Sequence, residues 1–172
     1  MSPTPEQVAR EKIDSLLTAA GWIVQDMGEF NRHAALGVAV REFTLPNGPC
    51  DYLLFVDGKA AGVIEAKKAG VTLSGVAEQS EKYMRTLPEH LATWGEHLRF
   101  DYEATGDETY FRDTGDPKPR SRRIFAFHQP ATLLHWLRED DTLRQRLGQM
   151  PPNRDGASQR GAIGCSRATS YS

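Results

Sequence analysis

Apolar side chains near the start of the chain repeat with the spacing of a helix. Thr4-Pro5-Glu6-Gln7 has the composition of a helix start, with Thr4 as the N-cap and Gln7 closing a capping box. Gly21 is the residue type that commonly ends a helix. The apolar positions between these signals lie roughly on one stripe: Val8, Ile13, Leu16, Leu17 and Ala20. The sequence therefore predicts a first helix that packs along one side.

The next apolar runs are short and have strand composition. Trp22-Ile23-Val24 can begin a first strand, and Val38–Leu45 predicts a second one. Residues 28–36 show no clear period and predict a loop, and Pro46-Asn47-Gly48-Pro49 turns the chain. The second strand offers three positions for the core: Val38, Val40 and Phe43.

Two further apolar runs, Tyr52–Val56 and Ala60–Ile64, are separated by Asp57-Gly58. Asp-Gly between two strand-like runs is the short turn signal of a β-hairpin. Asp51 stands at the entry to the first run, and Glu65-Ala66-Lys67 stands at the exit of the second. Ionised side chains at the rim of a buried hairpin are costly unless another charge compensates them, so this hairpin is the first place to look for chemistry.

Beyond Gly70 the pattern returns to a helical period, which Pro88 stops. One face of this predicted helix carries Val76, Gln79, Tyr83 and Leu87. The remaining predicted elements are a second hairpin, a short strand and one or two closing helices: 98–103 with 108–112, 124–127, and 132–137 with 142–147. Residues 90–98 are amphipathic and ambiguous. This order predicts an α/β fold, with a central mixed β-sheet flanked by helices.

Composition sets the limits of this fold. Residues 1–150 suffice for one domain with a sizeable core, whereas residues 151–172 are rich in Gly, Ala, Ser and Arg and predict a non-globular tail. A net charge of −2 argues against a free-standing, high-affinity nucleic-acid binder, but not against a nuclease to which other domains deliver DNA. Cys50 and Cys165 are too few for a disulfide framework, and no apolar run approaches the ~20 residues of a membrane span. We expect a cytoplasmic protein.

The hairpin residues have the residue types of a metal-dependent phosphodiesterase. Asp51 and Glu65 can supply the one or two carboxylates by which proteins usually hold Mg²⁺, and the Ala66 carbonyl is a further candidate ligand. Lys67 leaves a strand on the same face as Glu65, so its ammonium can orient an attacking water or stabilise charge on the phosphate. The alternative is that Glu-x-Lys arises by chance and Lys67 is merely a solvated strand end.

A shared face for Asp51 and Glu65 places a condition on the hairpin. With a plain two-residue turn, Asp51 would pair opposite Ile64 and point away from Glu65. Either an odd-length loop with Gly58 in the left-handed conformation or a β-bulge restores the parity. We therefore predict one of these two features.

Asp51, thirteen intervening residues and Glu65-Ala66-Lys67 resemble the PD-(D/E)xK nuclease core. Gln79 and Tyr83 resemble the QxxxY motif of some members. The wider text is similar to the N-terminal endonuclease domain of the restriction (R, or HsdR) subunit of type I restriction enzymes, over about Pro5–Pro152. The segments that carry this similarity are AREKIDSLLTAAGW, GVAVREF, DYLLFVDGKAAGVIEAKK, YEATGDETYFRD, PRSRRIFAFHQPATLLHWL and LGQMPP.

The resemblance implies a restriction-endonuclease-like fold and a role for each matching residue. Asp51, Glu65 and Lys67 would be catalytic, and Mg²⁺ would lie on Asp51, Glu65 and the Ala66 carbonyl. Gln79 and Tyr83 would sit beside the site and help to bind DNA. Independently of the resemblance, the charge of the neighbouring Lys68 could contact a DNA phosphate. The implied partners are double-stranded DNA and the modification (M) and specificity (S) subunits of a type I complex.

The chain departs from this family in two respects. Cys50 stands where the motif's name has proline, and no G-x-x-x-x-G-K-[ST] phosphate loop occurs, so the ATP-driven motor domains are expected to be missing. Two functions therefore stay open. One is an Mg-dependent endonuclease domain, and the other is a catalytically silent nuclease-like fold that docks partner subunits or DNA.

Several other residues have open assignments. A core Tyr83 with a hydrogen-bonded Gln79 explains those two residues as well as DNA binding does. Lys68 could equally belong to a solvated face. The densest basic cluster could contact DNA or a partner, or simply solubilise a loop: Lys118, Arg120, Arg122 and Arg123. A third acidic group near the metal could come from any one of three residues: Glu11, Glu42 and Glu103.

Overall fold

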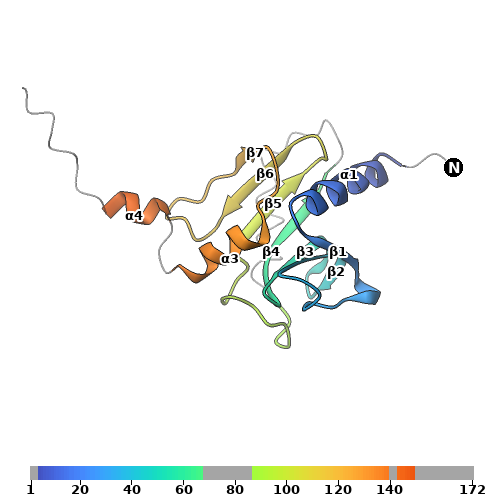
Figure 1. The fold of residues 1–172 in the computed structure, drawn as a ribbon, viewed down its shortest axis with the longest axis horizontal. Helices are drawn as coiled ribbons and strands as arrows, with labels where there is room; N and C mark the ends of the chain where they lie inside the picture. The colour runs from blue at the N-terminus through green and yellow to red at the C-terminus, as the bar shows by residue number, and fades with distance from the viewer. Residues whose placement is uncertain (1–3, 68–86, 140–142, 150–172) are drawn as a thin grey trace, which may run out of the picture.

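The computed structural model describes residues 4–67, 87–139 and 143–149. Within these residues the chain forms one mixed β-sheet with helices on it (Figure 1). The helical elements are α1 (Pro5–Ala19), the 3-10 turn η1 (Met27–Glu29), α3 (Pro130–Arg138) and α4 (Leu143–Gln149). The strands are β1 (Ile23–Asp26), β2 (Gly37–Leu45), β3 (Gly48–Val56), β4 (Lys59–Ala66), β5 (Phe100–Ala104), β6 (Thr109–Asp113) and β7 (Arg122–Ile124). The predicted α/β fold with a central mixed sheet is confirmed.

The order of the strands in the sheet follows their order in the chain, from β1 to β7. Strand β1 runs parallel to β2, and β4 runs parallel to β5, whereas the other neighbours are antiparallel. The hairpins β3–β4 and β5–β6 are thus joined side by side through the parallel β4–β5 contact. That contact brings the exit of the first hairpin next to the second one.

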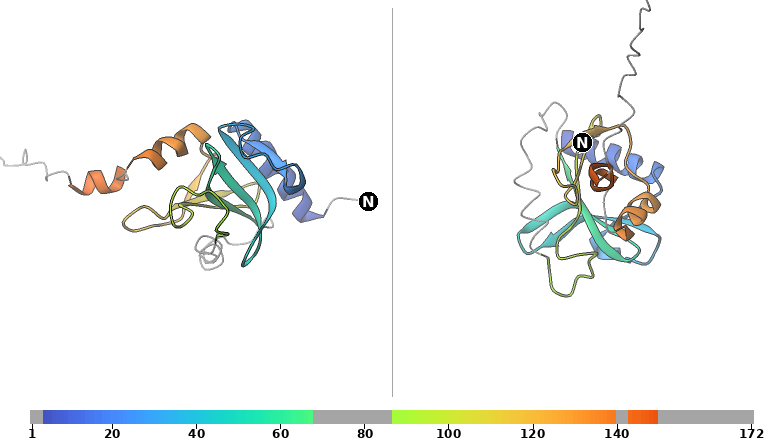
Figure 2. Two further views of the ribbon diagram at one scale, coloured as in Figure 1. Left: turned by 90° about the horizontal axis from the view of Figure 1, so that it is seen from below. Right: turned by 90° about the vertical axis from the view of Figure 1, so that its left-hand side faces the viewer.

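The sheet has an apolar cluster on each face. Helices α1 and α3 contribute Ile13, Leu17 and Leu133 to one cluster, which includes Tyr52, Ile64 and Tyr102 from the strands. Figure 2 shows these two helices on the same side of the sheet. The other cluster contains Val38, Val40, Phe43, Leu53, Phe55 and Val63. The three core positions predicted in Val38–Leu45 are therefore buried as expected.

The first helix has the ends that its sequence predicts. Gln7 N–H donates to the Thr4 hydroxyl at 3.3 Å, and Thr4 N–H donates to the Gln7 side chain at 2.8 Å. Gly21 follows the helix with a φ of 88°, in the left-handed region that favours glycine. Asp14 fixes the helix to the sheet, because its carboxylate accepts hydrogen bonds from Tyr52 and Arg41, each at 2.8 Å.

The bounds predicted for the last strand were wrong. The last strand covers Arg122–Ile124 rather than 124–127, because Phe125 is fully exposed and Phe127 turns into the core cluster beneath α3. Residues 90–98, which the sequence left ambiguous, form neither a helix nor a named strand. The bridge between Ala60 and Thr93 and a hydrogen bond of 2.8 Å from Trp94 Nε1–H to the Val56 carbonyl connect them to the sheet. The predicted helix over 72–87 and the tail over 151–172 lie outside the described residues, apart from Leu87.

No helix in the described part has the length and apolar character needed to cross a membrane.

Replacing Gly62 should disturb the β4–β5 contact. A Cβ at Gly62 would collide with the Phe100 carbonyl oxygen and lie 2.8 Å from the Phe100 Cβ. We expect Gly62→Ala to lower the free energy of unfolding by about 2 kcal/mol, as measured by denaturant unfolding, because overpacking forces neighbouring strands apart. The control is Gly28→Ala, since a Cβ at Gly28 meets nothing within 4 Å. Equal effects of the two variants would contradict this account of the packing.

His128 should make the stability of the protein depend on pH. The pKa of His128 is lowered from 6.5 to about 4, chiefly by burial and also by the Arg122 charge, while Asp113 opposes the shift. The Tyr102 hydroxyl lies 2.8 Å from its Nδ1 atom. Since the pKa is lower in the folded state, the unfolded chain binds the proton first. His128 therefore stabilises the fold fully above pH 6.5, and this contribution is lost as the pH falls towards 4.

Thermal unfolding of wild type and His128→Asn between pH 4 and 7.5 tests this effect. We expect the variant to lose less stability on acidification than wild type does. His135→Asn is the matched control, because its side chain is 66% exposed and pairs with Glu139 at the surface. If the stability of His128→Asn falls with pH as steeply as that of wild type, another group is responsible for the pH dependence.

Candidate active site

A β-bulge sets the register of the β3–β4 hairpin. Asp57 and Gly58 have φ values of 50° and 73°, as in a two-residue type I′ turn, and Val56 pairs with Lys59 across it. The register then shifts, because Phe55 pairs with Ala60 but Leu54 pairs with Gly62. Ala61 is the additional residue.

The bulge decides which side chains share a face. Beyond it Tyr52 pairs with Ile64, so the next step of the ladder places Asp51 opposite Glu65. Directly opposite residues point to the same face of a sheet. Of the two predicted alternatives, the bulge is the one that occurs, and the odd-length loop is not used.

Both oxygens of Asp51 have partners from neighbouring elements. Asp51 Oδ2 accepts a hydrogen bond of 2.9 Å from the Ala66 backbone N–H at the end of β4. Asp51 Oδ1 accepts one of 2.9 Å from Arg10 on α1. These two bonds fix the direction of the carboxylate and tie it to the strand that carries Glu65.

Glu65 and Lys67 lie together at the end of β4. Glu65 is 6% exposed, and its Oε2 lies 3.0 Å from Lys67 Nζ. The Lys67 backbone N–H donates to the Ala104 carbonyl at 2.8 Å, which holds this residue against β5. The pKa of the nearby Cys50 thiol is raised to about 12, chiefly by burial and also by the charges of Glu65 and Asp51. The charges of Asp51 and Glu65 thus act on the same neighbouring group. Cys50 is not a reactive thiolate there.

The parallel β4–β5 pairing adds a third carboxylate that the sequence did not single out. Glu103 pairs with Glu65 in register and is 3% exposed, and its Oε2 has no hydrogen-bond partner among the described residues. Burial raises the pKa of Glu103 and the Glu65 charge adds to the rise, whereas Lys67 and Arg112 lower it. The other two candidates lie elsewhere, since Glu11 is exposed on α1 and Glu42 is bound to Arg10. Only knowledge of the strand pairing could have selected Glu103.

Within the described part of the chain, the structure does not place the other residues predicted from the sequence at this site. Gln79, Tyr83 and Lys68 lie outside them, so their predicted contact with DNA stays a prediction. The basic cluster is partly engaged in packing: the Arg122 guanidinium lies 5.1 Å from the Phe111 ring centre, and Arg123 pairs with Glu108 at 3.2 Å.

Asp51, Glu65 and the Ala66 carbonyl fit a single divalent cation that takes few of its ligands from the protein. Among the described residues, no three His, Cys, Asp or Glu side chains converge as a metal site. A cation would therefore rest on Asp51, Glu65 and a backbone carbonyl such as that of Ala66, as is usual for Mg²⁺, which keeps several waters. Among the described residues, Asp51 pairs with Arg10 and Glu65 pairs with Lys67, and the buried Glu103 Oε2 has no hydrogen-bond partner. A divalent cation would add positive charge where these acidic side chains gather.

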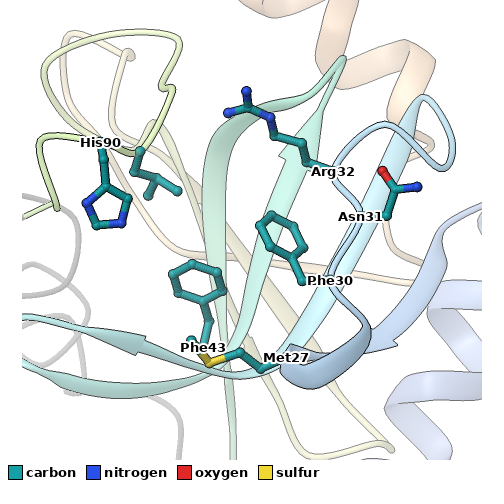
Figure 3. Close-up of a pocket in the computed structure, with 7 residues that line it drawn as sticks. Met27, Phe30, Asn31, Arg32, Phe43 and His90 are labelled. Atoms are coloured by element: carbon teal, nitrogen blue, oxygen red, sulfur yellow. The ribbon is translucent and has the colours of Figure 1, made fainter.

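A separate pocket of about 480 Å³ opens on the apolar cluster that contains Val38, Phe43 and Phe55 (Figure 3). Its wall is formed by Met27, Phe30, Asn31, Arg32, Phe43, His90 and Leu91. This lining contains no carboxylate, so the pocket is not the place where Asp51 and Glu65 act.

Comparison with known proteins bears on both the fold and the family. No curated protein matches the chain in sequence. A fragment of a protein described as an HsdR subunit of a type I restriction enzyme, from Vibrio vulnificus YJ016, has a similar structure with a TM-score of 0.56 and 19% sequence identity. The match covers 80% of this chain but only 26% of the other, so the chain spans about a quarter of that fragment's length. At this identity the likeness establishes the α/β fold.

The sequence match covers the stretch that contains the site. Residues 31–104 match the family model described as the type I restriction enzyme EcoKI endonuclease subunit second domain. This stretch includes the β3–β4 hairpin with Asp51 and Glu65, and it ends on β5 with Glu103 and Ala104. Residues 31–104 are thus similar to a domain of type I restriction enzyme endonuclease subunits.

Proposed function

We propose that the chain is a metal-dependent endonuclease domain of a type I restriction R subunit, which hydrolyses phosphodiester bonds of double-stranded DNA. The observation that carries the proposal is the hairpin register, in which a bulge places Asp51 opposite Glu65 and Lys67 lies 3.0 Å from Glu65. These residues lie within the stretch that matches the family.

Each residue of the hairpin has a distinct role in this proposal. Asp51, Glu65 and the Ala66 carbonyl would hold Mg²⁺, which when bound polarises the phosphate and lowers the pKa of the attacking water. Asp51 is already oriented by the Ala66 N–H and needs no rearrangement of its strand. Lys67 is fixed to Ala104 through its backbone, so its ammonium can orient the water or stabilise charge on a phosphate oxygen.

The proposal also covers the setting in which the domain acts. Gln79, Tyr83 and Lys68 would contact DNA beside the hairpin. The net charge of −2 gives weak intrinsic attraction to DNA, so delivery of the DNA by other parts of a type I complex fits this chain better than free diffusion does. The partners would be M and S subunits in the cytoplasm, and ATP would serve only separate motor domains.

Substitution of the hairpin residues should abolish metal-dependent cleavage. We expect wild type to nick supercoiled plasmid with Mg²⁺ or Mn²⁺. Asp51→Ala, Glu65→Gln and Lys67→Ala should each lose about 10²- to 10³-fold in rate, as expected when a group that stabilises transition-state charge is removed. The measurement is single-turnover conversion of plasmid to the nicked form on agarose gels.

The matched controls are Lys12→Ala and Asp107→Ala, which remove an exposed ion pair of 2.7 Å between α1 and the β5–β6 turn. These variants should nick at the wild-type rate. If wild type is inert in every metal while it still binds DNA or partner subunits, the domain is a docking module without turnover, and the endonuclease proposal is wrong.

A further inference from the structure

Arg10 links helix α1 to the candidate metal ligand. One guanidinium nitrogen, Nη2, donates to Asp51 Oδ1 at 2.9 Å, and the other, Nη1, donates to Glu42 Oε1 at 2.6 Å. The side chains of Asp51 and Glu42 are 21% and 65% exposed, so one end of this bridge lies within the site and the other lies in solvent. Arg10 thus connects a candidate ligand to a carboxylate outside the site.

The backbone at Glu42 supports a specific arrangement rather than a chance surface contact. Glu42 has a φ of 49°, in the left-handed region that residues with a Cβ rarely adopt. The β2–β3 ladder pairs Arg41 with Tyr52 and Phe43 with Cys50 on either side of this residue. Such a conformation costs free energy and persists where surrounding contacts determine it, often beside functional sites. Here it accompanies the bond between the Glu42 carboxylate and Arg10.

We infer that Arg10 is a positioning residue of the site. While no cation is bound, Arg10 orients Asp51 and neutralises its charge. When a divalent cation binds Asp51 and neutralises it instead, Glu42 holds the Arg10 guanidinium. The inference rests on the proposed metal-dependent function. It assigns Glu42 a role that acts only through Arg10, because the Glu42 side chain itself reaches toward solvent.

Removal of the Arg10 charge and removal of the Glu42 charge should have opposite effects on cation binding. The Arg10 charge lies 2.9 Å from an oxygen that the cation also needs, so its removal should favour cation binding. Removal of the Glu42 charge leaves Arg10 with Asp51 as its remaining partner, which should disfavour cation binding. Arg10→Lys keeps the charge but loses the two-pronged geometry and should have cation affinity near that of wild type.

The test is Mn²⁺ binding to the whole chain without DNA, measured by electron paramagnetic resonance of free Mn²⁺. We expect Arg10→Gln to bind Mn²⁺ about fivefold more tightly and Glu42→Gln to bind it about fivefold more weakly, a ratio typical of one charge near a partly exposed site. In the Arg10→Gln background, Glu42→Gln should have almost no further effect, because its partner is gone. Lys12→Gln and Asp107→Asn, which remove the exposed ion pair between α1 and the β5–β6 turn, should leave affinity unchanged.

Nicking at saturating Mn²⁺ provides a second readout. Arg10→Gln should cleave more slowly although it binds the cation more tightly, because Asp51 loses one of its two anchors, and Arg10→Lys should restore part of the rate. A purely structural role would lower affinity and rate together. Glu42→Gln changes an exposed side chain, so its predicted loss of affinity can be measured even if Arg10→Gln folds poorly.

The failures of the two proposals are distinguishable. If Asp51→Asn abolishes Mn²⁺ binding but the Arg10 and Glu42 variants do not change it, the metal site stands and the inference about Arg10 is wrong. An effect of Glu42→Gln that is equally large with and without Arg10 would also overturn it. If Asp51→Asn binds Mn²⁺ as wild type does, the proposed metal site itself fails, and the role of Arg10 fails with it.

Discussion

One additional residue in β4 determines whether this protein has a site at all. The type I′ turn at Asp57-Gly58 fits the twist of a hairpin, but by itself it would turn Asp51 and Glu65 to opposite faces. Ala61 shifts the register by one position and turns them to the same face. Because side chains alternate with a period of two, no smaller adjustment has this effect. The turn therefore serves folding, and the bulge serves the position of the carboxylates.

The site combines stable backbone contacts with a buried carboxyl group that is not fully paired. Its backbone is fixed by the Asp51–Ala66 and Lys67–Ala104 hydrogen bonds, yet Glu103 is buried beside Glu65 with an oxygen that has no hydrogen-bond partner in the described part of the chain. A fold selected for stability alone would pair or remove that group. Such local conflicts are expected where residues are kept for chemistry rather than for packing.

Local signals predicted the features that depend on neighbouring residues in the sequence. The capping box of α1 and the hairpin around Asp57-Gly58 follow from short motifs, and the need for a bulge follows from counting residues. The roles of Arg10 and Glu103 did not emerge in this way. Glu103 reaches Glu65 only through the parallel β4–β5 pairing, and Arg10 reaches Asp51 only through the docking of a helix 41 positions earlier in the chain. Periodicity carries no information about contacts of that range.

The strand order also has a consequence for how the protein is made. Each strand of the described sheet hydrogen-bonds to the strand that precedes it in the chain. Sheets of this kind have mostly short-range strand contacts and can grow along one edge as the chain leaves the ribosome. The β3–β4 hairpin can then fold before β5 is synthesised, so Asp51 and Glu65 come together first. The buried carboxyl group of Glu103 is then added to a preformed surface, and ordered synthesis reduces the time during which that strand is without a partner.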